Sequence, residues 1–372
     1  MTLPNIHQFR DLFVILRGVR GVGQGSVLQI ITLMEKEKFT TDDFWVNSQY
    51  IMRKSGIKEE CLNSILNELK DQNKYSYFEG LKRNNIRVIV YGDNDYPVAL
   101  TELAIPPLIL YCMGNQELTR DPSIAVVGTR RCTPYGVRAT KVLVKELLAQ
   151  GAQTIISGMM YGIDEVAHKA ALDESGRTIA VLGYGFGKWY PAGSKRLAEA
   201  IVQNGGMLIT EYPPGLSPNK GTFLARNRIV AALAQATLVI EAGERSGTQR
   251  TVAVAAELGR TVGAVPGPFD SPYSQGTKAF INQGALLVTE ARDLLDELGL
   301  ETSGTVGQRD NTMASVSPVQ REILNQLQAG PQSSDELCAT LSLTVVQLSF
   351  ELSCLELTGR IVRRGAEWYL LT

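Results

Sequence analysis

The 372-residue chain is poor in the side chains that build metal centres and disulfide frameworks. It has two histidines, His7 and His168, and five cysteines, of which no two are spaced as C-x-x-C. The absence of this spacing argues against a zinc ribbon and against a disulfide framework. With two histidines, a multi-histidine metal site is not expected either.

Long apolar runs and a strong net charge are missing as well. The longest apolar stretches, such as TIAVLGYG, are far too short to span a bilayer. The first residues, MTLPNIHQFRD, lack the charged start and apolar core of a signal peptide, so we expect a cytoplasmic location without membrane attachment. The formal net charge is −1, so nucleic-acid binding would have to come from a local basic patch.

The chain is long enough for two or three domains. Residues 1–83 read as a helical domain, in which Gly21-Val22-Gly23 is typical of a helix-hairpin-helix turn that offers backbone N–H groups to a phosphate. A plain helix–helix turn gives the same pattern. Residues 300–317 read as a linker, and 318–372 as a winged helix with three helices and a two-stranded wing.

The middle of the chain, residues 84–299, has a regular rhythm. From residue 123, short strands that are apolar throughout, such as SIAVV and TLVIEA, alternate with helical segments of ten or more residues. This pattern predicts an α/β fold with a doubly wound, Rossmann-like parallel sheet covered on both faces.

The first of these strands leads into a loop that does not suit a dinucleotide. SIAVVGTRRCTPYG has one glycine followed by Thr129, Arg130 and Arg131 where G-x-G-x-x-G would be needed. Ligands of such sheets bind at the carboxyl ends of the strands, and four of the six strand-end loops carry Arg or Lys. Aromatic side chains accompany them at Trp189, Tyr190 and Phe223. Cations for phosphates and flat rings for bases predict a single-stranded nucleic acid as the ligand.

Two further stretches could hold an anion. In FLARNRIVAALA, cations from Arg226 to Arg228 are predicted at a helix start, where they oppose the helix dipole unless an anion bridges them. The alternative is an ion pair with Glu241 or Glu244. In ERSGTQ, Ser246 to Thr248 could cradle a phosphate or form an ordinary helix cap.

SGMMYGIDEVAH places Asp164 and His168 four residues apart, on one helix face. They could form an acid/base pair. The interpretation we favour is that Asp164 complements the helix dipole and that His168 is a structural hydrogen-bonding partner.

These motifs occur in an order that resembles the DNA processing protein A family (DprA/Smf). The resemblance rests on VVGTRR, SG…GID, TIAVLG, LITEYPPG, ARNRIVAAL, LVIEAGERSGT and AVPG, and on RVIVYGDNDYPVALTELAIPPLILYCMGN upstream. It covers residues 85–299 closely and the two ends more loosely. Three segments depart from the family's usual pattern: Met159-Met160-Tyr161, Thr248-Gln249-Arg250 and Leu224-Ala225.

The resemblance implies a homodimeric single-stranded DNA-binding protein of natural transformation, competence and DNA recombination. Such proteins protect incoming or exposed strands and help load the RecA recombinase, and neither a catalytic activity nor a cofactor is attributed to them. The family's pocket maps onto Gly128, Arg130, Gly158, Lys195 and the segment from Arg226 to Arg228, with Lys188 and Lys220 as alternatives to Lys195. The complete set of predicted DNA-binding residues is Gly128, Thr129, Arg130, Arg131, Ser157, Gly158, Lys195, Lys220, Phe223, Arg226, Asn227, Arg228, Arg245, Ser246, Gly247 and Thr248.

Two other functions are open: a divergent branch with another nucleic-acid-sensing role, and a nucleotide-processing enzyme that resembles the phosphoribohydrolases. The enzyme interpretation lacks the paired glycines and the glutamate of the PGGxGTxxE loop in EAGERSGTQRT. The tail, 318–372, has four basic and six acidic residues, and its third helix has no Lys or Arg. We therefore predict that the tail is an interaction or regulatory module and adds little to DNA affinity.

Overall fold

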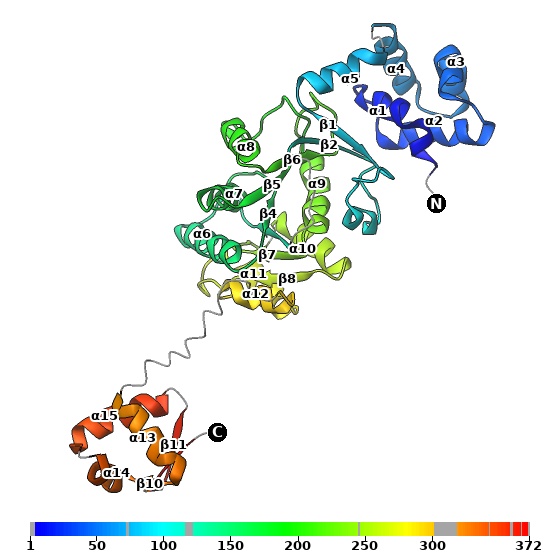
Figure 1. The fold of residues 1–372 in the computed structure, drawn as a ribbon. Helices are drawn as coiled ribbons and strands as arrows, with labels where there is room; N and C mark the ends of the chain where they lie inside the picture. Colours follow the sequence, from blue (N-terminus) through cyan, green and yellow to red (C-terminus); the bar gives the residue numbers. More distant parts are fainter. Residues whose placement is uncertain are drawn as a thin grey trace. The chain divides into compact units, whose positions relative to one another are not determined.

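The computed structural model describes residues 4–71, 74–115, 122–244, 246–300, 318–341, 343–357, 360–365 and 367–370. The chain divides into two compact units, Met1–Ser303 and Gly304–Thr372 (Figure 1). The predicted linker, 300–317, lies outside the described residues except for Leu300. Among the described residues, no helix is both long enough and apolar enough to cross a membrane.

The first unit is built on a nine-stranded sheet with the order β1-β2-β6-β5-β4-β3-β7-β8-β9. The strands are β1 (Arg87–Val90), β2 (Ile109–Gly114), β3 (Ser123–Val127), β4 (Thr154–Ser157), β5 (Arg177–Val181), β6 (Met207–Thr210), β7 (Ala236–Val239), β8 (Thr261–Ala264) and β9 (Leu286–Leu287). β3 to β9 pair in parallel, with Ala125 level with Ile156 on one side and with Thr237 on the other. β1 and β2 extend this sheet in antiparallel fashion, so the predicted α/β fold is confirmed.

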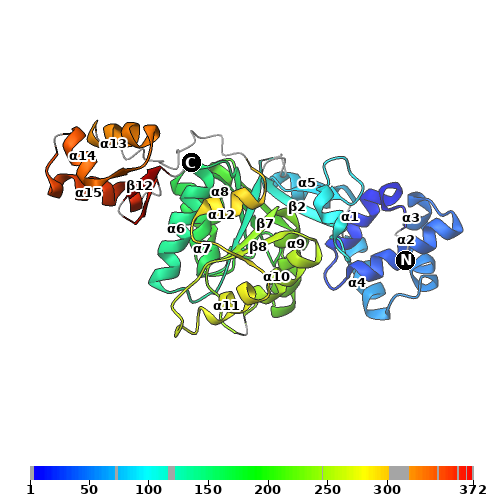
Figure 2. The same ribbon diagram turned by 90° about the horizontal axis from the view of Figure 1, so that it is seen from below.

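Helices cover both faces of the sheet because the central strands are apolar on both faces. In β3, Ile124 and Val126 pack against one layer of helices, while Ala125 and Val127 pack against the other. The first layer contains α6 (Pro134–Ala149), α7 (Ile163–Asp173) and α12 (Ala291–Glu297); the second contains α9 (Lys220–Leu233), α10 (Thr248–Glu257) and α11 (Gln275–Asn282). α8 (Ser194–Gln203) contacts α7, β5 and β6 (Figures 1 and 2).

The helical start packs against the same sheet. It comprises α1 (Arg10–Gly18), α2 (Gln24–Glu37), α3 (Thr41–Lys54), α4 (Glu59–Asp71) and α5 (Lys74–Arg83), with the short 3-10 turn η1 (Ile6–Phe9) before them. Its core, which includes Phe13 and Leu16, is continuous with Tyr111 of β2. Between α1 and α2, Gly21 has a φ of +85° and Gly23 is the N-cap of α2, so the glycines form a tight helix–helix turn.

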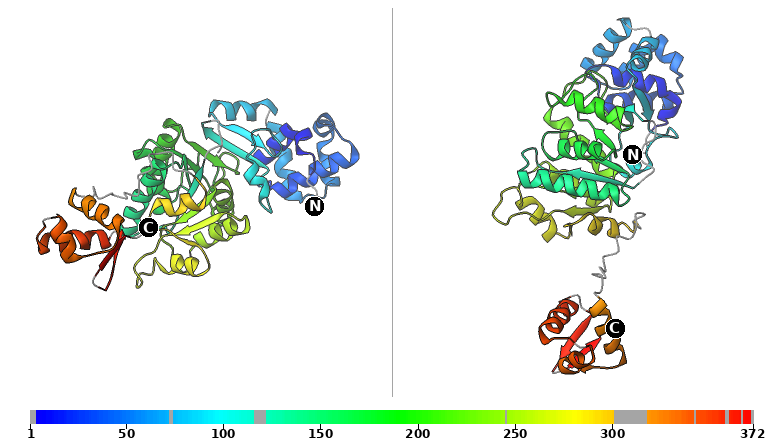
Figure 3. Two further views of the ribbon diagram at one scale, coloured as in Figure 1. Left: turned by 60° about the horizontal axis from the view of Figure 1, so that its bottom comes forward. Right: turned by 60° about the vertical axis from the view of Figure 1, so that its left-hand side comes forward.

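The second unit is a winged helix (Figure 3). It contains α13 (Pro318–Ala329), α14 (Ser334–Leu341) and α15 (Val345–Leu357), and a sheet of β10 (Gln332–Ser333), β12 (Glu367–Leu370) and β11 (Ile361–Arg364) in that order. Leu348, Leu352 and Leu355 of α15 are buried in its core, as their spacing predicts. Val345, the first residue of the helix, lies outside this core and is 66% exposed.

Candidate nucleic-acid interface

A cavity of about 680 Å³ lies at the carboxyl ends of the parallel strands. The strand order reverses beside β3, because β4 lies on one side of it and β7 on the other. The loops after β3 and β7 therefore lead to helices on opposite faces, α6 and α10, and a crevice opens between them. This is the position at which the sequence predicts a ligand.

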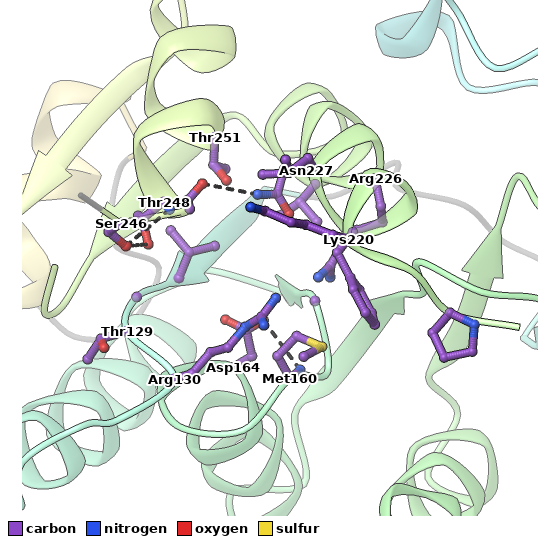
Figure 4. Close-up of a pocket in the computed structure, with 18 of the residues that line it drawn as sticks. Thr129, Arg130, Met160, Asp164, Lys220, Arg226, Asn227, Ser246, Thr248 and Thr251 are labelled. Carbon is purple, nitrogen blue, oxygen red and sulfur yellow. Dashed lines mark hydrogen bonds between the residues drawn. The ribbon is translucent and has the colours of Figure 1, made fainter. Parts of the chain in front are cut away.

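Most of the predicted DNA-binding residues line this cavity. They are Gly128, Thr129, Arg130, Arg131, Gly158, Lys220, Phe223, Arg226, Asn227, Ser246, Gly247 and Thr248. The side chains of Arg130, Arg131 and Lys220 are exposed at its rim. Figure 4 shows Arg130 reaching into the cavity from the loop after β3, and Lys220 reaching into it from α9.

Aromatic rings form one wall of the cavity. The Arg130 guanidinium lies over the Phe223 ring, 5.5 Å from its centroid, and the Tyr190 ring is 5.4 Å from the same ring. A cation and two rings at one wall match the stacking and phosphate contacts that a single strand uses. The loops after β3, β5 and β6 thus converge as the sequence predicts.

Arg226 lies on the floor of the cavity. The prediction that it lies at the start of a helix was wrong. α9 begins at Lys220 with Asn219 as its cap, so Arg226 is in the second turn and the helix-dipole argument does not apply to it. Its side chain is 3% exposed, and Nη1 donates a hydrogen bond to the Val181 carbonyl at 2.8 Å. Burial lowers the pKa of Arg226 from its ordinary value, and Asp164 opposes this shift.

Gly158 explains how the floor accommodates this arginine. A Cβ atom added at Gly158 would overlap the Arg226 guanidinium, so a side chain there would displace the cation. Gly128 is equally constrained, because a Cβ there would overlap Ile163 and the Glu241 carbonyl. The glycines of the strand-end loops therefore provide space for close packing of the protein itself.

Hydrogen bonds hold the loop after β7, but they do not form the ordinary Ser/Thr cap considered for ERSGTQ, because the N-cap of α10 is Gly247 and no side chain caps this helix. The Ser246 hydroxyl accepts a hydrogen bond from the Thr248 N–H at 3.2 Å at the start of α10. Asn227 of α9 donates to the Gly247 carbonyl at 3.2 Å, which ties this loop to the opposite wall. Arg245 lies outside the described residues.

Three predicted residues lie outside the cavity lining. The Ser157 hydroxyl is buried and donates to the Val126 carbonyl. Lys195 lies on α8 and pairs with Glu199 at 3.6 Å, so among the three candidate lysines it is Lys220 that lines the cavity. Arg228 forms a two-pronged ion pair with Glu211, at 2.9 and 2.7 Å. This is the ion-pair alternative from the sequence, with a different carboxylate.

Asp164 and His168 face different surroundings and form no acid/base pair. The His168 Nδ1 atom lies 2.7 Å from the Thr178 hydroxyl, and burial lowers the pKa of His168 to about 3. This fits the structural role that we favoured from the sequence. Asp164 lines the cavity, although its side chain is nearly buried; burial raises its pKa, against the attraction of Arg226.

Glu241, which the sequence considered as a partner for the arginines, has a structural role. Its carboxylate accepts hydrogen bonds from the Thr133 N–H at 2.9 Å and from the Thr133 hydroxyl at 2.5 Å. Thr133 is the N-cap of α6, so a buried carboxylate from the loop after β7 stabilises the start of this helix. Within the described ranges, no cluster of three His, Cys, Asp or Glu residues could hold a metal ion.

Sequence reasoning missed some of the lining. Asn219 and Thr251 both line the cavity and were not predicted. A signal existed for Asn219, because N-K-G-T forms a capping box in which Asn219 and Thr222 exchange hydrogen bonds. No local pattern marks Thr251, which lies one turn inside α10.

The chain resembles known proteins over most of its length. The sequence profile of the DNA recombination-mediator protein A family matches residues 87–299, and that of the DprA winged helix domain matches 308–366. The DNA processing protein DprA of Mycobacterium tuberculosis is 38% identical over 309 residues, which cover 79% of each chain.

Two solved structures are similar in fold and sequence. The crystal structure of DprA from Streptococcus pneumoniae has a TM-score of 0.64 and 31% identity, covering 77% of this chain and 97% of that one. A structure that describes the single-stranded DNA binding mode of DNA processing protein A from Helicobacter pylori has a TM-score of 0.52 and 31% identity, covering 57% and 95%.

Proposed function

Since the chain belongs to the DNA recombination-mediator protein A family, we propose that its strand-end cavity binds single-stranded DNA. The observation that carries this proposal is the convergence of Arg130, Arg131 and Lys220 at the rim beside the Phe223 ring. Guanidinium and ammonium groups neutralise phosphates of any sequence, so affinity depends mainly on the backbone. The single-stranded DNA binding mode described for the Helicobacter pylori relative is consistent with this ligand class.

The cavity also suits a single strand better than a duplex. Its rings and cations lie within one recess of about 680 Å³ between loops, where an unstacked base can enter. In a duplex the bases are stacked and paired, so this wall would be reached only after unpairing. We therefore expect a preference for single strands.

The test is a titration of labelled single-stranded and duplex oligonucleotides of the same sequence at two salt concentrations. We expect tighter binding of the single strand and an affinity that falls with salt, because counterions are released from the phosphates. Equal affinity for both forms, or a salt-independent affinity, would contradict the proposal.

Protection of incoming strands and loading of the RecA recombinase belong to the same proposal, as does a homodimer. They rest on family membership. Sedimentation of the purified protein tests the dimer, and strand exchange by RecA on strands coated with a single-strand-binding protein tests loading. If the protein does not stimulate strand exchange, the proposed role in RecA loading is wrong.

We also propose that the cavity is not catalytic, in contrast to the phosphoribohydrolase alternative. Glu241 is bonded to Thr133 and does not line the cavity, which leaves Asp164 as the sole carboxylate among the described lining residues. Incubation with nucleoside monophosphates should release no free base. Robust release that Asp164→Asn abolishes would move the protein to the enzyme class.

A further inference from the structure

Asp164 is out of place in a cavity that binds phosphates. The described lining contains four cationic side chains, Arg130, Arg131, Lys220 and Arg226, and Asp164 is its single carboxylate. The side chain comes from the first turn of α7, and the residue is 9% exposed. A carboxylate repels a phosphate, so the part of the ligand that meets Asp164 must be a hydrogen-bond donor.

The hydrogen bonds around Asp164 leave it available to a ligand. Within the chain, the Asp164 carboxylate is in contact with the Ser157 hydroxyl, whose proton is donated to the Val126 carbonyl at 2.6 Å. The hydrogen bond that it accepts from the Met160 N–H is long, 3.4 Å to Oδ2. On the opposite side of the floor, Nε of Arg226 is buried and has no hydrogen-bond partner among the described residues. Buried polar groups are normally paired, so an acceptor and a donor left incomplete beside one cavity point to a ligand that supplies both.

Asp164 and Arg226 line the same cavity, so one ligand can contact both of them. Arg226 is the largest charge acting on Asp164, and Asp164 is the largest charge acting on Arg226. Figure 4 shows Arg226 entering from α9 and Asp164 lying beside Arg130 on the other side of the cavity. The floor therefore offers a donor on one side and a carboxylate on the other.

A nucleobase edge can satisfy this arrangement, and guanine satisfies it best. Guanine presents an acceptor, O6, followed by two adjacent donors, N1–H and the exocyclic amine, and a carboxylate accepts both donors at once. Thymine presents one donor between two acceptors, and its second carbonyl would face the carboxylate. Adenine and cytosine offer an amine beside a ring acceptor, so one carboxylate oxygen would stay unpaired.

We propose that Asp164, together with Arg226, reads the edge of one inserted base and favours guanine at a single position of the bound strand. The proposal rests on the proposed function, because the rim cations and the Phe223 wall hold the rest of the strand through phosphates and stacking. It makes Asp164 a specificity-determining residue within a site that otherwise tolerates any sequence.

The experiment compares three strands that differ only in the base at one central position. They are a twelve-nucleotide thymidine tract, the same tract with one central guanosine, and the same tract with one central inosine, which lacks the exocyclic amine. We expect the wild-type protein to bind the guanosine strand about fivefold to tenfold more tightly than the inosine strand, since inosine keeps the N1–H donor but lacks the amine that completes the bidentate contact. Asp164→Asn should bring this ratio to about one.

Glu165→Gln is the matched control, because it removes a negative charge from the same turn of α7 without touching the cavity lining. It should keep the wild-type ratio. Equal wild-type affinity for the guanosine and inosine strands would overturn the inference, as would an Asp164→Asn variant that weakens all three strands by the same factor. Failure of the thymidine tract itself to bind would instead overturn the proposed function.

Competition with free nucleotides distinguishes a guanine within a DNA strand from the guanine of a free nucleotide. We expect dGMP to displace the strand only weakly, because it brings one phosphate to a rim with three cations. It should still compete better than dIMP. If dGMP displaces the labelled strand as effectively as the unlabelled strand does, the ligand is a free nucleotide and not a DNA strand.

Discussion

The strand-end cavity of the first unit and the winged helix of the second are two candidate DNA-binding surfaces with opposite character. The cavity collects four cations and one carboxylate within its described lining. On the winged helix, α15 stands where a recognition helix would be, and it carries Glu351 and Glu356 but no Lys or Arg. Its exposed side chains include Phe350, which is 67% exposed. The same chain thus concentrates phosphate-binding groups in one fold and exposes apolar groups on the other.

The two surfaces show that a fold alone does not determine a binding partner, which depends on the side chains that the fold displays. A winged helix that reads DNA needs cations on its third helix, because every phosphate contact is electrostatic. Here the wing arginine Arg363 lies over the Trp368 ring, 5.8 Å from its centroid, which engages that cation within the domain.

Removing two rim cations should have the largest effect on DNA affinity. Arg130→Ala combined with Lys220→Ala should weaken single-strand binding about a hundredfold, at about 1.4 kcal/mol for each tenfold step. The dependence of affinity on salt should also become shallower by about 0.7 for each lost phosphate contact. Fluorescence anisotropy at several salt concentrations measures both. Arg363→Ala in the wing is the control and should change affinity less than twofold; a comparable loss there would erase the contrast between the surfaces.

Arg228→Ala should destabilise the first unit by about 2 kcal/mol, because it leaves the nearly buried Glu211 without its partner. The same arginine donates to the Ile105 carbonyl, so the loop between β1 and β2 loses a tether. Chemical denaturation measures the effect. Arg260→Ala breaks a second tether of this loop, to Glu102, whose side chain is 47% exposed, and should cost less than about 1 kcal/mol. If the Arg228→Ala variant is folded but binds DNA much more weakly, Arg228 contacts DNA directly.

His168 should make the first unit sensitive to acid. Its pKa is lowered from 6.5 to about 3 in the folded protein, so the unfolded chain takes up the proton first as the pH falls. Stability is fully present above pH 6.5 and should fall by about 2 kcal/mol between pH 6.5 and 5. Thermal unfolding across this range measures it. His168→Gln should flatten the curve between these values, and an unchanged slope would place the acid sensitivity elsewhere.

The sequence predicted the fold well because its signals are local. The apolar strands and the helices between them depend on short-range periodicity, and the loop glycines mark the strand ends. It also placed Arg130 and Phe223 in one site, because carboxyl ends of parallel strands share one edge.

What the sequence could not give are the contacts that depend on how elements pack. The start of α9 lies six residues before Arg226, and the segment FLARNR carries no sign of it. The pairing of Arg228 with Glu211 joins a helix to the end of a strand, so only the folded chain reveals which arginine faces the cavity. Asp164 was identified on its helix, but its exposure to a cationic recess depends on the position of Arg226.

Asp164→Asn should raise the thermal stability of the first unit at neutral pH. Burial raises the pKa of Asp164 in the folded protein, so an ionised Asp164 carboxylate costs stability at neutral pH. Asparagine removes that cost. The gain should disappear as the pH falls and the native carboxyl is protonated. A lower melting temperature at neutral pH would mean that Asp164 serves chiefly as the counter-charge of Arg226.

Removing the second unit should have the smallest effect on DNA affinity. Because residues 304–372 cluster as a unit of their own, a chain that ends at Leu300 keeps the whole cavity. The tail residues 318–372 carry four basic and six acidic side chains, which oppose a polyanion, so we expect single-strand affinity at fixed salt to change less than threefold. Phe350→Ala in the full chain is the companion variant: it should leave DNA affinity unchanged, because an exposed ring on an acidic helix suits a protein partner better than a phosphate backbone. A loss beyond about tenfold on truncation, equivalent to about 1.4 kcal/mol, would show that the winged helix holds DNA despite its charge.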